Sequence, residues 1–194
     1  MSFAIIFAVV LVAALAIIFM RRRTPSRIIV TSPRLGFLNL KGPAAHELLI
    51  SDKSALAPLF RECEEATVDP PQCSVLFLYC DVFANGRIGA TEASLRELIH
   101  RSGASIVVLA TDNPSDGFRA ATSDTTNGMA NLVMTMQRND PAFATFYQRL
   151  FKQMFAGVTM PLAWVALAPQ VPGRDHLECP SSVFLCERGQ LTFA

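Results

Sequence analysis

Two apolar runs of strand length, at residues 74–79 and 104–110, are each followed by a short loop that is rich in polar side chains. Carboxylate, amide, hydroxyl and guanidinium groups in such positions commonly bind a small polar ligand. The candidates among the polar residues of the two loops are Asp81, Asn85, Arg87, Asp112, Asn113 and Ser115. We predict that they form a ligand-binding site, and that Ser32 and Arg34, at the exit of the first predicted strand, lie beside them. The alternative is that the two loops only turn the chain.

Cys80 follows the first apolar run directly and is the best candidate for a nucleophile. A reactive thiol needs a lowered pKa and a neighbouring base. The sequence places none of the three histidines where it would supply that base. A hydrolase that depends on Cys80 is therefore the weakest of the functional hypotheses.

The standard motifs of several enzyme classes are absent from the sequence. It contains no GxGxxG after a strand, no GxxxxGK[ST], no HExxH and no GxSxG. His176, Cys179 and Cys186 are too few for a zinc site without a paired CxxC. We therefore expect no metal and no cofactor, and the sequence favours a domain that is not an enzyme.

The segment between the two apolar runs carries the signals of a helix. Thr91 can cap its first turn, Leu95 and Leu98 share one face, and Gly103 stands where a left-handed residue ends a helix. Runs that are apolar at every position are typical of strands covered on both faces of a parallel sheet. Residues 74–110 therefore predict a right-handed βαβ unit.

Further strands are predicted at residues 27–32, 35–40 and 162–168, and a hairpin at 182–193. Helices are predicted at 54–66, at 125–136 and at 141–156, the last of them capped by Asp140. The apolar stripe of this last helix, which we expect to pack in the core, consists of Phe143, Phe146, Tyr147, Leu150, Phe151 and Met154. Strands that alternate with helices predict a three-layer α/β domain of Rossmann or flavodoxin type with a mostly parallel sheet. Ligands of such sheets bind at the carboxyl ends of the strands.

An apolar stretch of eighteen residues, from Phe3 to Met20, precedes this domain. It contains no charge, proline or glycine, and as a helix it would reach roughly 27 Å, about one hydrocarbon core. Arg21, Arg22 and Arg23 follow it, which is opposite to the charge order of a signal peptide. We predict a single transmembrane helix with its N-terminus outside the plasma membrane and the domain in the cytoplasm. The predicted organisation is an anchor at 1–23, a linker at 24–27 and an α/β domain at 28–194.

Composition supports this assignment and excludes one class of partner. The formal net charge of +1 provides no basic surface for general nucleic-acid binding. The five cysteines include no CxxC, which fits reduced thiols better than a disulfide framework. The partners that we expect are the lipid bilayer, through residues 3–20, and a second copy of the chain, a nucleotide ligand or another membrane protein.

Part of the domain, about residues 74–168, resembles the caspase-like CHAT domains. The resemblance lies in a strand ending in LYC, a helix, a strand ending in VVLATDN, and the later segments FATFYQRLFKQMFAG and PLAWVALA. In that family the first strand ends in His-Gly and the second in a turn that contains Cys. Here Cys80-Asp81 and Asp112-Asn113 occupy those places, so the resemblance implies the fold without the protease activity.

The layout is similar to that of a second group, the single-helix membrane effectors of bacterial defence that carry a CARF sensor domain. Those proteins bind cyclic oligonucleotides and act through the membrane helix. The CARF pocket motif is not evident here, so this resemblance covers the architecture alone.

Three functional hypotheses follow from the sequence. The first is a non-catalytic sensing or interaction domain that binds a nucleotide-like ligand and acts through oligomerisation of the membrane helix. The second is a scaffold that holds another membrane protein through apolar stripes that include Phe146 and Phe151. The third is the hydrolase that depends on Cys80.

Overall fold

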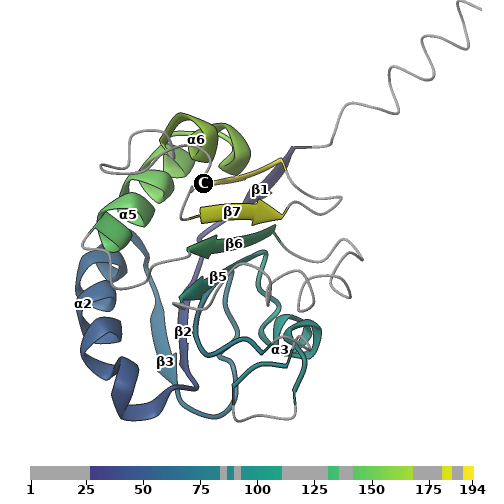
Figure 1. Ribbon diagram of the computed structural model, residues 1–194. Coiled ribbons are helices and arrows are strands. Elements are labelled where there is room, and N and C mark those ends of the chain that lie inside the picture. Colours follow the sequence, from purple (N-terminus) through teal and green to yellow (C-terminus); the bar gives the residue numbers. More distant parts are fainter. Residues whose placement is uncertain are drawn as a thin grey trace, which may run out of the picture.

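Two β-sheets and their covering helices make up the described part of the chain in the computed structural model (Figure 1). The structure describes residues 27–83, 87–89, 93–110, 131–135, 142–167, 181–184 and 190–194. The larger sheet has six strands in the order β3-β2-β4-β5-β6-β7, and the smaller sheet consists of β1 and β8.

The six strands of the larger sheet run parallel except for β7, which is antiparallel to β6. They are β2 (Leu35–Asn39), β3 (Cys63–Ala66), β4 (Val75–Tyr79), β5 (Ile106–Ala110), β6 (Asn131–Thr135) and β7 (Ser181–Phe184). Strand β3 pairs with one edge of β2, and β4 and the later strands follow on the other side of β2, as in flavodoxin-like sheets. The α/β class and the mostly parallel sheet are therefore confirmed, as are the strands predicted at 35–40, 74–79 and 104–110.

The central strands β4 and β5 are buried at every position because helices cover both faces of the sheet. Alternate residues of a strand enter different cores. Phe77 of β4 packs with α2 (His46–Leu56), α5 (Ala142–Phe155) and α6 (Met160–Leu167), whereas Leu76 and Leu78 pack with α3 (Leu95–Ser102). Figure 1 shows α2, α5 and α6 together on one side of the sheet and α3 on the other.

Helix α3 begins and ends as its sequence signals require. The Ser94 side chain accepts a hydrogen bond from the Glu97 amide at 3.2 Å, so Ser94 caps the helix. The helix ends at Gly103, whose φ of 64° is the left-handed conformation that glycine adopts readily. The cap predicted at Thr91 is wrong because α3 begins at Leu95 and its capping residue is Ser94.

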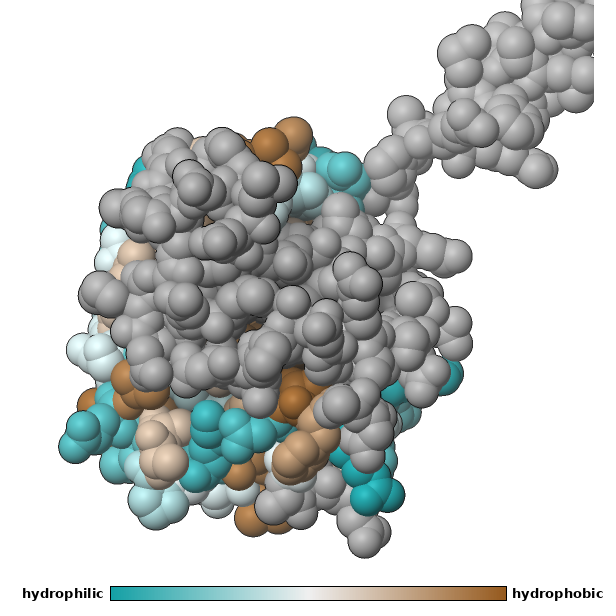
Figure 2. All heavy atoms as spheres, viewed as in Figure 1, coloured by the Kyte–Doolittle hydropathy of each residue, from teal (hydrophilic) through white to brown (hydrophobic). Residues whose placement is uncertain are grey.

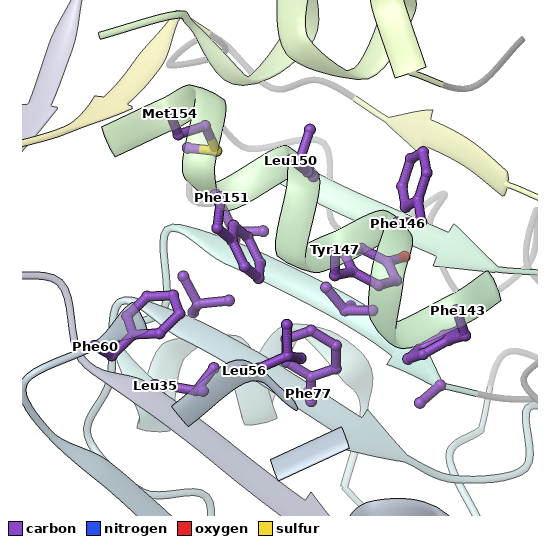
Figure 3. Close-up of a cluster of buried hydrophobic side chains, with 14 of the residues drawn as sticks. Leu35, Leu56, Phe60, Phe77, Phe143, Phe146, Tyr147, Leu150, Phe151 and Met154 are labelled. Carbon is purple, nitrogen blue, oxygen red and sulfur yellow. The ribbon is translucent and has the colours of Figure 1, made fainter. Parts of the chain in front are cut away.

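The apolar stripe of α5 packs into the core, as predicted (Figure 3). Phe77 lies at the centre of this aromatic cluster: its ring centroid is 5.2 Å from that of Tyr147 and 5.4 Å from that of Phe37. The T-shaped pair with Tyr147 has the edge-to-face geometry that aromatic rings prefer. Phe146 and Phe151 are themselves buried, so these two side chains are not part of an exposed surface.

The two-stranded sheet places both ends of the described chain beside the helices. Strand β1 (Ile28–Val30) runs parallel to β8 (Leu191–Phe193). Phe193 is buried in the same core as α5, and the Thr192 hydroxyl donates a hydrogen bond to the Met154 carbonyl at 2.8 Å. The predicted strand at 27–32 is therefore present, but it does not belong to the main sheet.

The helix predicted at 54–66 is wrong. The helix of this region begins earlier, at His46 after a 3-10 turn (Gly42–Ala45), and gives way at Leu56 to a second 3-10 turn (Ala57–Leu59). Pro58 removes an amide donor from the helix at this point. Residues Cys63–Ala66 then form β3, because the free edge of β2 supplies their backbone partners.

Three other elements differ from the predictions: the helix at 125–136, the strand at 162–168 and the hairpin at 182–193. Asn131–Thr135 forms β6 instead of part of a helix, and Met160–Leu167 forms α6 instead of a strand. The helical spacing of Leu132 and Val133 is overridden in the first case, because pairing with β5 and β7 makes the segment a strand. The second segment is a short apolar run, which has no period that separates helix from strand. The predicted hairpin is wrong because β7 and β8 lie in different sheets.

Several predicted features lie outside the described residues: the apolar stretch from Phe3 to Met20, the linker up to Ser26, and the cap at Asp140. In the part of the chain that the structure does describe, no helix is both long and apolar enough to cross a membrane.

Gly36 is required by a close approach between β2 and the segment before β4. A Cβ atom at this position would lie 2.7 Å from Cys73 Sγ and 2.8 Å from Pro71 Cγ. Gly36→Ala is therefore expected to lower the free energy of unfolding by about 1–3 kcal/mol, the usual cost of overpacking a core. Urea denaturation of the full chain in mild detergent, followed by circular dichroism, measures the change.

The matched control is Gly42→Asn. Gly42 has a φ of 60°, which asparagine tolerates, and no atom lies within 4 Å of the added Cβ. An equal loss of stability in the two variants would contradict the assignment of a steric role to Gly36.

Candidate functional site

The carboxyl ends of β2 and β4 meet where the strand order of the main sheet reverses. Asn39 and Tyr79, the last residues of these strands, stand opposite each other in the pairing register. A crevice at such a reversal is where open α/β sheets bind their ligands, because the connections from the two strands leave in opposite directions. The loops that follow β2 and β4 are therefore the structural candidates for a site.

The Asn39 side chain shapes the loop after β2. Its amide nitrogen donates to the Gly42 carbonyl at 2.9 Å, and its oxygen accepts from the Lys41 amide at 3.0 Å. The Leu40 amide donates to the Tyr79 carbonyl at 2.8 Å, which ties the loop to the end of β4. Asn39 is 5% exposed, so these bonds satisfy a buried amide and fix the direction in which Lys41 leaves the sheet.

Lys41 and Asp81 form an ion pair that joins the two loops. Lys41 Nζ lies 3.0 Å from Asp81 Oδ1, and the side chains are 22% and 50% exposed. A pair this accessible adds little to stability. Its effect is to place one cationic and one anionic group, both open to solvent, at the point where the strand order reverses.

The loop after β4 folds into a small hairpin. Val82 and Ile88 form an antiparallel bridge, and both side chains are buried under α3. The Phe83 amide donates to the Arg87 carbonyl at 3.0 Å, and the Gly89 amide donates to the Asp81 carbonyl at 2.6 Å. The two apolar residues therefore anchor the loop while Asp81 and Arg87 remain at the surface.

A cavity of about 710 Å³ opens on the same edge of the sheet, between the end of β2 and the start of α2. Its polar lining comes from Asn39, His46, Glu47 and Thr67, and Gly42 and Pro43 form part of its wall. Amide, imidazole, carboxylate and hydroxyl groups can together bind a ligand that carries both donors and acceptors.

Cys80 is unsuited to nucleophilic attack. Its side chain is fully buried among the residues that pack against α3. Burial raises the pKa of the Cys80 thiol far above its usual value, and the Asp81 carboxylate raises it further. The thiolate is therefore disfavoured, and the hydrolase hypothesis loses its nucleophile.

Ser32 and Arg34 do not lie beside these loops, so the prediction that they do is wrong. Both precede β2, and the Arg34 carbonyl accepts hydrogen bonds from the Ser74 and Val75 amides at the start of β4. Arg34 thus lies at the amino edge of the sheet, where its guanidinium is 3.9 Å from Glu62. The error arose because β1, which Ser32 follows, is not a strand of the main sheet.

Of the remaining predicted site residues, Asp81 and Arg87 follow β4 as expected, whereas Asn85, Asp112, Asn113 and Ser115 lie outside the described residues. Sequence reasoning missed Asn39 and Lys41. The signal that would have found them is present, since Asn39-Leu40-Lys41-Gly42 stands at the end of a correctly predicted strand.

A buried polar contact lies beneath the site. The Tyr79 hydroxyl donates a hydrogen bond to the Asp52 carboxylate, which α2 holds at 1% exposure. Tyr79→Phe removes a donor from a buried carboxylate, and we expect it to lower the free energy of unfolding by about 1.5–3 kcal/mol. Thermal denaturation followed by circular dichroism would detect a loss of this size.

The double variant Asp52→Leu/Tyr79→Phe is the comparison for this prediction, because it removes both partners. We expect the double variant to lose less unfolding free energy than the sum of the losses in Asp52→Leu and Tyr79→Phe, because the two residues interact directly. A loss equal to that sum would contradict a direct coupling.

Within the described ranges, no group of three or more histidine, cysteine, aspartate or glutamate side chains could hold a metal ion. Comparison of the chain with protein-family models, with curated proteins and with solved structures gives no match.

Proposed function

We propose that this protein is a single-pass membrane protein whose cytoplasmic α/β domain is a non-catalytic sensor. The domain binds a nucleotide-like ligand at the carboxyl edge of its sheet and passes its state to the membrane through oligomerisation of the N-terminal helix. By the similarity of layout to single-helix effectors, its setting is bacterial defence.

The observation that carries the proposal is the composition of the edge at β2 and β4. A loop fixed by Asn39 and the accessible Lys41–Asp81 pair lie where flavodoxin-like sheets bind their ligands. A cavity of about 710 Å³ opens beside them, and Asn39 belongs to its lining. The Lys41 ammonium group can exchange Asp81 for a phosphate oxygen, and the amide and hydroxyl groups of the cavity match the edges of a base or ribose.

The non-catalytic part of the proposal rests on the strands that carry the catalytic residues in CHAT domains. The resemblance requires two neighbouring parallel strands, and β4 and β5 are such a pair. At the end of β4 the catalytic histidine is replaced by Cys80, whose buried thiol is disfavoured as a nucleophile. These features support a caspase-like fold that has kept the sheet and lost the protease chemistry.

The membrane part of the proposal rests on the sequence before Arg27. Residues 3–20 are long and apolar enough for one hydrocarbon core, and three arginines follow on the side that would face the cytoplasm. The side chains of this stretch are all apolar, and its alanines permit close helix contacts.

Titration of nucleotides, cyclic ones included, against the full chain in lipid vesicles tests the sensor. We expect one nucleotide class to bind, and Lys41→Ala to weaken that binding by roughly 10–100-fold through loss of a charged hydrogen bond. The matched control is Lys53→Ala, because Lys53 also pairs with a carboxylate, Glu65 at 2.9 Å, and neither residue belongs to the loops after β2 and β4. Failure of every nucleotide to bind, together with a strictly monomeric chain, would overturn the proposal.

A further inference from the structure

Helix α6 presents an apolar face to solvent. The helix, with the sequence MPLAWVAL, contains no charged residue, and its Leu162 and Val165 side chains are 63% and 62% exposed. Phe155, at the end of the preceding helix, is 37% exposed. Large aliphatic side chains at this exposure mark a contact surface when they gather on one element.

The same helix lies where the chain enters the domain. The Arg27 guanidinium donates a hydrogen bond to the Gly157 carbonyl at 2.5 Å, and Gly157 lies in the turn between α5 and α6. In Figure 2, apolar atoms lie at the upper edge of the molecule, where Figure 1 places α6 and the start of β1. The entry point and the apolar helix are therefore neighbours.

The short tether limits how far this face can lie from a bilayer. Only six residues, 21–26, separate Met20 from Arg27, and fully extended they allow at most roughly 25 Å between the two. Helix α6, with eight residues, is itself only about 12 Å long. If residues 3–20 span the membrane, Arg27 lies within one tether length of its surface, and α6 begins three residues after Gly157, the residue that Arg27 contacts.

The charge around α6 fits an anionic membrane surface. The helices α5 and α6 and their connection, residues 142–167, contain Arg149 and Lys152 but no aspartate or glutamate. Together with Arg27 and the three arginines of the tether, these segments carry only positively charged side chains. Basic residues next to an apolar helix face are the usual composition of a segment that lies in the membrane interface.

From these observations we propose that α6 docks on the lipid bilayer through Leu162 and Val165 and fixes the orientation of the domain at the membrane. The occupant of this face is the lipid surface itself, not another protein. This inference rests on the proposed membrane anchor, and it adds a second contact that sets which way the ligand edge faces.

Trp164, the only tryptophan of the chain, is a reporter within α6. The full chain is reconstituted in vesicles of phosphatidylcholine and phosphatidylglycerol, with and without lipids brominated close to the headgroup. We expect brominated lipid to quench Trp164 fluorescence, and Leu162→Glu/Val165→Glu to abolish the quenching. The control Ile50→Glu/Val68→Glu adds the same charge at positions that are 51% and 74% exposed, and should leave the quenching unchanged.

Alkaline carbonate extraction of the same vesicles separates the two proposals. A chain that resists extraction but shows no quenching overturns the docking of α6 and leaves the anchor intact. A chain that is extracted overturns the anchor. Absent quenching, together with a dimer that can be cross-linked in the unchanged chain but not in Leu162→Glu/Val165→Glu, would show that a second copy covers the face, and would also overturn lipid docking.

Discussion

Phe77→Ala is expected to lower the free energy of unfolding by about 3–5 kcal/mol, the range measured when a buried aromatic residue is truncated. Phe77 is fully buried at the centre of β4, and its ring contacts the rings of Phe37, Tyr147 and Phe151. Figure 3 shows Phe77 beneath α5, so truncation opens a cavity between the sheet and that helix. Urea denaturation of the full chain in detergent, followed by circular dichroism, measures the loss.

Two further variants show whether this loss is specific to the cavity. Phe77→Leu keeps most of the volume and should cost less than Phe77→Ala. Phe83→Ala removes a phenylalanine that is 51% exposed in the loop after β4, and should change stability by no more than about 0.5 kcal/mol. Similar losses for Phe77→Ala and Phe83→Ala would contradict the position of Phe77 in the core.

Stability is expected to fall in alkaline solution because the Cys73 thiol is buried. Burial raises the pKa of Cys73 from its ordinary value of 9.0 to about 12. The unfolded chain then releases the proton at lower pH than the folded one, so the stabilisation is complete below pH 9.0 and is lost as the pH rises towards 12. At about 1.4 kcal/mol for each pH unit, the Cys73 contribution amounts to about 4 kcal/mol over this window.

The measurement is the difference in unfolding free energy between the wild type and Cys73→Ala at several pH values from 8 to 11. Other groups, Cys80 and the tyrosines among them, titrate in both proteins and cancel in this difference. The stability advantage of the wild type should shrink as the pH rises above 9.0. Parallel loss of stability in the two proteins would contradict a buried thiol at Cys73.

The sequence predicted those elements whose local signals agree with their tertiary environment. Strands β4 and β5 are apolar at every position and lie in the middle of the sheet, and α5 has an unbroken stripe on one face. In α3 the left-handed Gly103 marks the end of the helix correctly. Such segments need no knowledge of their neighbours to be assigned.

The elements that were predicted wrongly depend on partners distant in the chain. Cys63–Ala66 is a strand because β2 offers it a free edge, and β1 leaves the main sheet because it pairs with β8, more than 150 residues later (Ile28 with Leu191). The predicted position of the site also depended on partners that are distant in the chain. Asp81 was found because β4 was assigned to the correct sheet, whereas Arg34 was placed at the wrong edge because β1 was not.

The structure also changes the balance among the three functional hypotheses. The scaffold hypothesis relied on Phe146 and Phe151, which pack inside the domain, and the hydrolase hypothesis relied on Cys80, which is buried. The sensor proposal retains a candidate site, because Asn39, Lys41 and Asp81 come together where the strand order reverses. Its output requires that the segment before Arg27 hold the domain at a membrane.

Alkaline carbonate extraction of membranes from cells that produce the full chain, combined with protease treatment from the cytoplasmic side, tests that requirement most directly. We predict that the chain stays in the membrane pellet and that cytoplasmic protease digests the α/β domain. A matched variant with arginines in place of Val10 and Ala13 should be released, because two charges at the centre of the apolar stretch each cost about 2.5–3.5 kcal/mol of insertion. Release of the unchanged chain into the supernatant, or protection of its domain from cytoplasmic protease, would contradict the account.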